Sequence, residues 1–269
     1  PAPGGMDEPA TAEDEPAPVY DPRFAGPQFG VAMHPALERV DFAKWREWLP
    51  GEPAPSDEAA TIAEALREQG YADDLLDDGV ALVTSLVGRT LRVVLPEGVQ
   101  LCDVPGESRR PELEFQFPLQ PTRVDAMLQL LHAHDVVPDR HAFGFRQRLE
   151  GLMTGLVDLT YQHDGRWYVL DYKSNRLPRY DEAALQAAMH HSEYDLQALV
   201  YTLALHRWLR FRLGDQYDYA RDFGGHRYVF SRGIDLDAPA NGAPAGVHAR
   251  RFEPALIHAL DALFSGAPA

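Results

Sequence analysis

The sequence predicts an α/β (α+β) domain in which helices flank a small mixed sheet and the N-terminal part is helical. Apolar residues recur at helical spacing over residues 56–69 and 75–95. Two β-rich runs, at residues 153–163 and 166–173, meet at an Asp-Gly pair, which is typical of a two-residue hairpin. A long apolar run over residues 194–213 then predicts a helix after the hairpin.

The composition indicates a globular protein and gives no sign of a membrane segment. Of 269 residues, 45% are hydrophobic, which is enough for a core. The longest apolar stretch, residues 198–205, is far shorter than the roughly 20 residues that a membrane helix needs. Cys102 is the only cysteine and cannot form an internal disulfide, which agrees with a reducing compartment. We therefore expect a cytoplasmic protein that does not contact the membrane.

Proline, alanine and acidic residues dominate the start of the chain. Residues 1–28 contain almost nothing to bury, so we expect a disordered linker there. Because the chain begins at Pro1, we interpret it as a fragment of a longer protein. The domain is expected over residues 29–269. Its predicted parts are a helical part at 29–110, a catalytic core at 111–235 and a C-terminal helix within 250–266.

Individual elements follow from periodicity and from residues that end helices. We expect helices at residues 29–49, 56–69, 75–95, 122–134, 182–190, 194–213 and 253–264. Gly70 and Gly214 are the expected stops of two of them. Besides the hairpin, alternating patterns predict strands at residues 111–118, between two prolines, and at 227–231.

The net charge of −16 argues against a surface that holds nucleic acid by itself, because phosphate contacts usually come from clustered Lys and Arg. The objection weakens if the acidic excess lies in the linker and at a metal site, and if other domains deliver the nucleic acid. The sequence has no Gly-rich phosphate loop and no Cys-His zinc cluster, so it carries no ATP motor of its own.

The hairpin brings charged residues together. With the turn at Asp164-Gly165, Asp158 is expected to face Asp171 across the two strands. Two opposed carboxylates are destabilising unless something compensates their repulsion. A divalent cation with a preference for oxygen ligands does so. Because side chains alternate along a strand, Lys173 is expected on the same face as Asp171.

Two carboxylates, a metal ion and a lysine are what metal-assisted phosphodiester cleavage requires: a cation that polarises the phosphate and acidifies a water, and a group that positions that water. An isolated Asp-X-Lys is more often a solvated surface feature. The opposed Asp158 favours the catalytic interpretation.

The other candidate site residues are weaker evidence when each is considered by itself. Gln197 and Tyr201 share a helix face and are either polar groups in a core helix or contacts to the scissile strand. Glu112 and Glu114 share one strand face and either bring a further carboxylate to the metal or are solvated. His34 by itself would be an ordinary helix residue.

Four segments together resemble the C-terminal nuclease domain of the RecB family, within the PD-(D/E)XK nuclease superfamily. They are GLVDL (155–159), LDYKSN (170–175), YDLQALVYTLALHRWLR (194–210) and FGGHRYVFSRG (223–233). The resemblance implies a restriction-endonuclease-like fold and a Mg²⁺-dependent deoxyribonuclease of the exonuclease V type.

The resemblance also implies roles for particular residues. The implied catalytic residues are Asp158, Asp171, Lys173, Gln197 and Tyr201, and the implied metal ligands are His34, Asp158, Asp171 and Tyr172. Glu112 fits a further acidic residue near the metal, with Glu114 as the alternative if the register is shifted. Pro35 directly follows His34 and puts the geometry of that ligand in question, because proline disturbs a helix.

The implied partners are single-stranded DNA delivered by a helicase, RecC-like and RecD-like subunits and a RecA-type recombinase, acting in double-strand-break resection and recombinational repair. Two other interpretations remain. One is a catalytically inactive nuclease fold that docks partner subunits or a recombinase. The other is a metal phosphoesterase for small molecules. Intact Asp158, Asp171 and Lys173 favour an enzyme over the docking fold, and the RecB-like segments argue against the small-molecule phosphoesterase.

Overall fold

The computed structural model describes residues 21–237 and 244–266, which fall into two compact units. Unit 1 comprises Pro1–Gly106, Asp171–Leu185 and Tyr228–His248, and unit 2 comprises Glu107–Leu170, Gln186–Arg227 and Ala249–Ala269. Most of the predicted linker, residues 1–20, lies outside the described residues. Its last part is structured: Pro22–Phe24 form a 3-10 turn, and Phe24 is buried.

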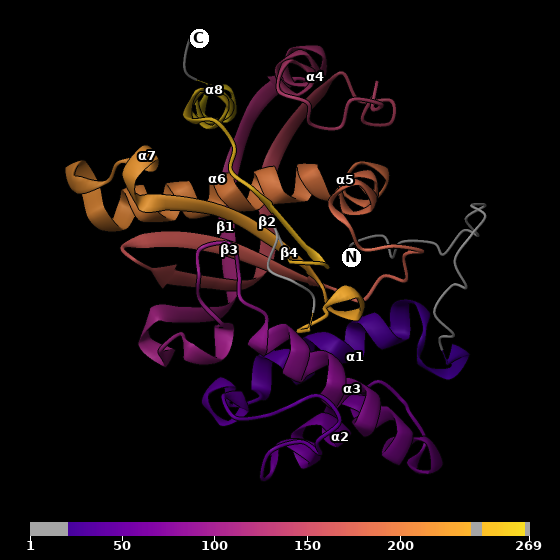
Figure 1. Ribbon diagram of the computed structural model, residues 1–269. Coiled ribbons are helices and arrows are strands. Elements are labelled where there is room, and N and C mark those ends of the chain that lie inside the picture. Colours follow the sequence, from indigo (N-terminus) through magenta and orange to yellow (C-terminus); the bar gives the residue numbers. More distant parts are fainter. Residues whose placement is uncertain (1–20, 238–243, 267–269) are drawn as a thin grey trace. The chain divides into compact units, whose positions relative to one another are not determined.

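Three helices form the helical part of unit 1 (Figure 1): α1 (Gly26–Arg39), α2 (Glu58–Glu68) and α3 (Leu76–Arg92). The helix predicted for residues 29–49 is shorter than expected. It ends at Arg39 because Val40 is extended, and Asp41 then caps a separate 3-10 turn at Phe42–Trp45. Pro35 lies inside α1, and the helix continues past it. Gly70, with φ of 81°, follows α2 as predicted.

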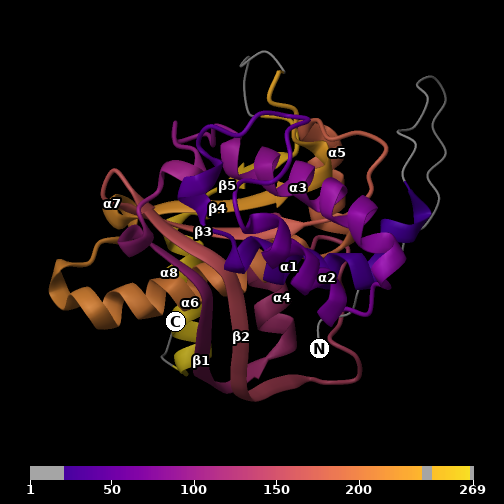
Figure 2. The same cartoon turned by 90° about the horizontal axis from the view of Figure 1, so that it is seen from below.

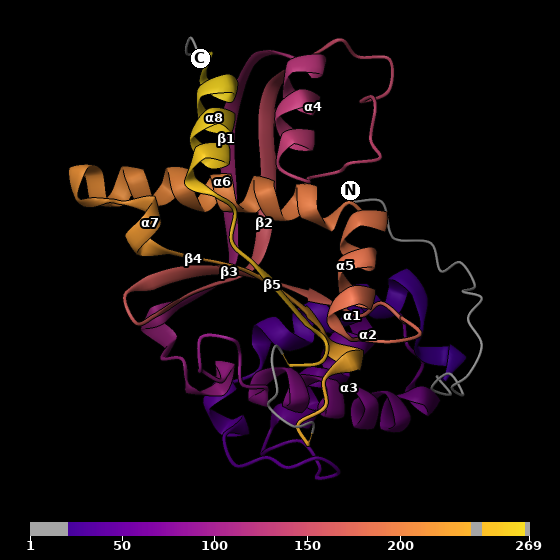
Figure 3. The ribbon, with the colours of Figure 1, turned by 45° about the horizontal axis from the view of Figure 1, so that its top comes forward.

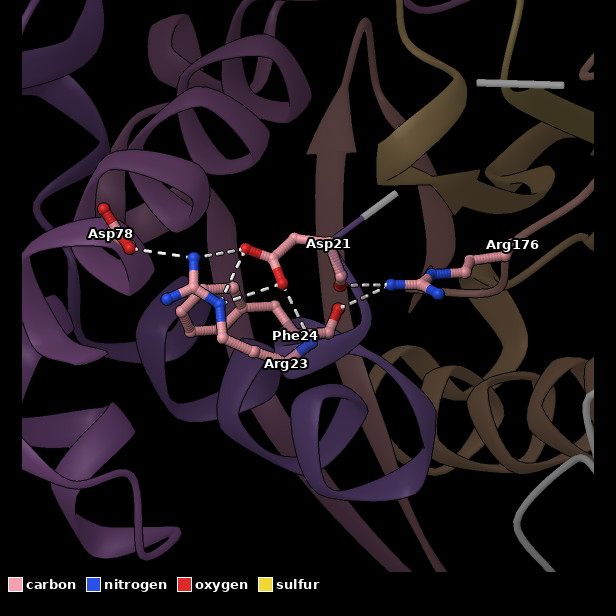
Figure 4. A network of polar contacts seen from close by, with 5 residues as sticks. All are labelled: Asp21, Arg23, Phe24, Asp78 and Arg176. Atoms are coloured by element: carbon pink, nitrogen blue, oxygen red, sulfur yellow. Dashed lines mark hydrogen bonds and ion pairs between the residues drawn. The ribbon is translucent and has the colours of Figure 1, made fainter. Parts of the chain in front are cut away.

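Residues 21–24 are fastened to two other segments of unit 1 (Figure 4). The Arg23 guanidinium bridges the carboxylates of Asp21, at 2.6 Å, and Asp78, at 2.8 Å. From the other side, Arg176 Nη2 donates to the Asp21 carbonyl at 2.6 Å and to the Phe24 carbonyl at 3.4 Å. The segment that follows the predicted hairpin is therefore tied to the start of the described chain.

One five-stranded sheet has the order β1-β2-β3-β4-β5. Its strands are β1 (Arg109–Arg123), β2 (Arg148–His163), β3 (Arg166–Lys173), β4 (Phe223–Phe230) and β5 (Val247–Arg250). β1 and β2 run side by side as long antiparallel strands (Figure 2), and β2 pairs with β3 in the same sense. β5 was not predicted. Helices and a small sheet in one chain confirm the α/β class.

The predicted hairpin is present. His163 pairs with Arg166, and the turn residues Asp164 and Gly165 have φ of 47° and 75°, as a type I′ turn requires. β1 is almost twice as long as the strand predicted at 111–118. Pro118 and Pro121 lie inside it, which is possible because β1 is the edge strand of the sheet, where a missing N–H on the open side costs no ladder hydrogen bond.

The remaining helices are α4 (Val124–Ala133), α5 (Glu182–His191), α6 (Tyr194–Leu213), α7 (Tyr219–Asp222) and α8 (Pro254–Ser265). Within unit 2, α8 lies along β1 (Figure 3). It is joined to α6 by Asp261, whose carboxylate accepts hydrogen bonds at 2.6 Å from both Arg207 and Arg210. Burial by itself would raise the pKa of Asp261, but the two guanidinium groups outweigh it and hold that pKa below its usual value. In the part of the chain that the structure describes, no helix combines the length and the apolar character needed to cross a bilayer.

Burial of His206 in α6 makes unit 2 sensitive to acid. The side chain is 3% exposed, its Nδ1 lies 3.0 Å from the Tyr217 hydroxyl oxygen, and burial lowers its pKa from 6.5 to about 4. As the pH falls, His206 is protonated in the unfolded chain before it is protonated in the folded one. The free energy of unfolding therefore decreases as the pH falls from about 6.5 towards 4. We expect this residue to account for at most about 3 kcal/mol of that loss.

Urea unfolding of the wild type and of His206→Gln at pH 7 and pH 5 measures this contribution. The free energy of unfolding should fall more steeply with acid in the wild type, whereas the exposed His141→Gln control should keep the wild-type slope. Equal slopes for the wild type and His206→Gln would contradict the assignment.

Candidate active site

Asp171 and Lys173, at the end of β3, form a buried ion pair in unit 1. The Asp171 side chain is 2% exposed, and its Oδ2 lies 2.6 Å from Nζ of Lys173. Nζ also lies 5.2 Å from the centroid of the Tyr228 ring, whose π face attracts a cation. Taking two charges out of water is costly, so such a pair persists only where the surrounding structure holds its geometry.

Two arginines hold the loop that follows Lys173. Arg232 donates from Nε to the Ser174 carbonyl at 2.9 Å and from Nη2 to the Phe24 carbonyl at 2.7 Å. Its guanidinium also lies 4.6 Å from the centroid of the Phe29 ring. Arg176 holds the same loop through the contacts described above. The backbone beyond Lys173 is therefore fixed from two directions.

Sequence reasoning missed both arginines as supports of the candidate site. Each stands within or beside a segment quoted for the family resemblance, which is a signal that could have indicated them. Their partners are far away along the chain, because Arg232 contacts carbonyls 58 and 208 residues from it. A local pattern does not reveal such contacts.

His34 lies in α1, also in unit 1, and is partly buried. Gly30 is four residues earlier and therefore on the same helix face. A Cβ at Gly30 would lie 3.1 Å from Oγ of Ser174, so the helix approaches the loop after Lys173 closely at that point. The structure thus places His34 on the face of α1 that packs towards this loop.

Glu112 lies across from Asp158 in unit 2. The β1-β2 register pairs Pro111 with Leu159 and Leu113 with Val157, and its only shift comes later, between Leu119 and Thr122. Counting one residue along each strand from these pairs sets Glu112 opposite Asp158. Glu114 instead pairs with Leu156. Glu112 also has φ of 47°, which an L-residue rarely adopts within a strand.

The β2-β3 register is that of the predicted hairpin as far as Leu159 and Leu170, which are paired. Asp158 and Asp171 are the next residues on their strands. That these two carboxylates face each other stays a prediction.

Gln197 and Tyr201 are brought together on α6. The Gln197 amide Nε2 donates to the Tyr201 hydroxyl at 2.9 Å, and the Tyr201 ring meets Phe115 of β1 edge-on, with 5.9 Å between centroids. The amide and the phenol are therefore held on one side of unit 2, against the same strand that carries Glu112.

Comparison with known proteins places this chain in a family. Residues 12–232 match the PD-(D/E)XK nuclease superfamily, and this range includes Asp158 and the sequence Asp171-Tyr172-Lys173. The chain belongs to the PD-(D/E)XK nuclease superfamily. The sequence Asp171-Tyr172-Lys173 has the form of the (D/E)XK pattern that gives the superfamily its name.

Three relatives are RecBCD enzyme subunit RecB proteins. This PD-(D/E)XK chain is 32% identical to that of Escherichia coli (strain K12) over 265 residues, 96% of the chain and 21% of the subunit. It is 39% identical to that of Haemophilus influenzae over 62% of the chain and 14% of the subunit. It is 29% identical to that of Mycolicibacterium smegmatis over 95% of the chain and 25% of the subunit. The chain thus spans a quarter or less of each of these relatives.

The donor atoms of this family member suit a hard divalent cation. Counting along the β1-β2 register sets Glu112 opposite Asp158, where two like charges repel each other unless a cation lies nearby. In unit 1, Asp171 is a buried carboxylate, and oxygen ligands of this kind are those that Mg²⁺ prefers. Over residues 21–237 and 244–266, no three His, Cys, Asp or Glu side chains form a ready cluster. The residues nevertheless fit the cation by their chemistry.

The support given by Arg232 has a measurable consequence. We expect Arg232→Lys to lower the free energy of unfolding by about 1–3 kcal/mol. The planar guanidinium donates to two carbonyls and packs on a ring at the same time, and the smaller ammonium group of lysine cannot make all three contacts. Arg179→Lys is the matched control, since Arg179 is 75% exposed and pairs with Asp181 at the surface. Urea unfolding of both variants checks this. An equal effect of the two substitutions would show that Arg232 is not a support.

Proposed function

We propose that the chain is a Mg²⁺-dependent deoxyribonuclease that hydrolyses phosphodiester bonds of DNA. The buried Asp171–Lys173 pair is the observation that carries the proposal, because it lies in the segment that matches a nuclease superfamily. A buried carboxylate and a mostly buried ammonium held 2.6 Å apart are costly to maintain, and a chain that only docks partners does not need them.

Each candidate residue has a role in this proposal. Asp158 and Asp171 are the primary metal ligands, and Tyr172, through its backbone carbonyl, and His34 complete the set. Glu112 contributes a further carboxylate beside Asp158. Bound Mg²⁺ would polarise the scissile phosphate and acidify a water. Lys173 holds that water in line, while Gln197 and Tyr201 bind the scissile strand.

We further propose the setting of the RecB relatives for this chain. It would receive single-stranded DNA from a helicase on the same polypeptide, assemble with RecC-like and RecD-like subunits and interact with a RecA-type recombinase in the cytoplasm. Double-strand-break resection and recombinational repair would be its role. The support is the similarity to subunits named as parts of RecBCD, over 96% of the chain for the Escherichia coli protein.

A cleavage assay tests the proposed activity. Linear single-stranded DNA should be cut with Mg²⁺ and left intact with a chelator, and Asp171→Asn or Lys173→Ala should each lower the rate by roughly a hundredfold or more, because each removes a group that acts on the developing charge. Variants that fold, as judged by circular dichroism, and still cut at the wild-type rate would refute it. If the wild type does not cut, calorimetry with Mg²⁺ decides between a metal-binding enzyme that needs its helicase and a docking fold without a metal.

The register of β1 predicts which of two glutamates matters. Glu112→Gln should reduce Mg²⁺ affinity and cleavage by roughly tenfold or more, since it removes a negative charge opposite Asp158. Glu114→Gln is the matched control on the same strand and should leave both unchanged, because Glu114 pairs with Leu156. Cleavage rates measured over a Mg²⁺ titration separate affinity from turnover. The reverse ranking of the two variants would contradict the register-based assignment.

A further inference from the structure

Residues 140–148, which we call the basic-aromatic tip, differ in charge from the rest of the chain. The sequence RHAFGFRQR contains three arginines, two phenylalanines and no acidic residue, whereas the chain has 41 Asp and Glu against 25 Lys and Arg. The tip lies in unit 2, between α4 and the start of β2. A local excess of positive charge within an acidic chain suits a polyanion.

The tip presents one aromatic ring to solvent. Phe143 and Arg146 form an antiparallel bridge, and Gly144, with φ of 59°, makes the tight turn between them. Phe145 therefore lies at the apex of the turn, and it is 108% exposed. Arg146 and Arg148 are also exposed, and neither forms an ion pair with a residue that the structure describes. A ring and two guanidinium groups are thus open to a ligand.

The base of the tip is firmly anchored. Arg140 donates from Nε to Oε1 of Glu193 at 2.6 Å and from Nη2 to Oε2, and its guanidinium stacks 4.6 Å from the centroid of the Phe143 ring. His132 Nε2 donates to the Arg140 carbonyl at 2.8 Å. At the other end, the Val124 amide donates to the Gln147 carbonyl at 3.0 Å. Anchoring at both ends lowers the entropy that the tip would lose on binding.

We propose that the basic-aromatic tip is a binding surface for single-stranded DNA, in which a base stacks on Phe145 and backbone phosphates contact Arg146 and Arg148. Stacking on an aromatic ring beside cationic side chains is how proteins hold single strands without reading their sequence. An acidic protein partner would be attracted by the arginines but would not need the exposed ring. The ring therefore favours a nucleic acid with unpaired bases.

The tip is joined directly to the strand that carries Asp158. Arg148 is the first residue of β2 and Asp158 is ten residues further along it. In an extended strand this is at most about 33 Å. The proposal rests on the proposed nuclease function, because it assigns the surface that holds the DNA away from the reacting phosphate. It would also give a chain of net charge −16 a local basic surface for DNA.

Binding without cleavage tests the tip separately from the nuclease activity. Fluorescence anisotropy of the full chain, in chelator, would compare a labelled 30-nucleotide thymidine strand with an abasic strand of equal length. We expect the wild type to prefer the strand with bases. Phe145→Ala should weaken its binding by about fivefold or more, to the level of the abasic strand. Arg146→Ala should weaken both and reduce the slope of log affinity against log salt by about 0.7.

Two exposed residues elsewhere in unit 2 provide matched controls. Phe211 is 88% exposed, and Arg166 is exposed at the start of β3, so Phe211→Ala and Arg166→Ala remove the same groups from other places. Equal losses for Phe145→Ala and Phe211→Ala, or no loss for folded Phe145→Ala, would overturn the proposal. So would competition by polyglutamate as strong as that by unlabelled thymidine strand, which would indicate an acidic protein partner. Binding that depends on Phe145 in a chain that does not cut would leave this proposal standing and remove only the proposed activity.

Discussion

The buried pair of Asp171 and Lys173 is the constraint on which much of unit 1 depends. A carboxylate that is 2% exposed is tolerable only while the ammonium group stays within hydrogen-bonding distance. Small shifts of the backbone at the end of β3 would separate the two charges. The contacts of Arg176 and Arg232 with carbonyls of residues 21, 24 and 174 remove that freedom. The close approach of Gly30 to Ser174 adds a steric limit from α1.

The features that the sequence predicted are those that local chemistry determines. Asp164 and Gly165 tolerate positive φ, so the hairpin turn and its register follow from two residues. The helix at 194–213 has the same bounds in the structure, because Gly214 ends it in a conformation that suits glycine. Strand alternation predicted that Lys173 lies on the same face of β3 as Asp171, and the two side chains are in contact.

The features that the sequence did not predict depend on residues far apart along the chain. In the sequence alone, the prolines of β1 indicate the ends of a strand. They can lie inside β1 because it is an edge strand, and only the pairing of the strands reveals that. The cross-strand positions of Glu112 and Glu114 depend on the β1-β2 register, and the start of β1 could not be located from composition. The first helix was predicted too long, because apolar residues after Val40 pack from a 3-10 turn instead. The supports of Asp171 and Lys173 come from side chains tens to hundreds of residues away.

Unit 1 is assembled from three stretches of chain, with the other unit's residues between them. During synthesis, residues 21–106 therefore leave the ribosome well before the other two stretches of unit 1. Those later stretches carry the end of β3 and the arginines whose contacts complete the core. A unit built from separate stretches of chain cannot finish folding until the last stretch has been synthesised. Until then its apolar surfaces stay exposed, where they can bind chaperones or aggregate. For expression work this means that a truncation at residue 106 would separate the helices from Asp171 and Lys173 rather than isolate an independent N-terminal domain. Engineered fusions and split versions of the protein should keep all three stretches in one chain.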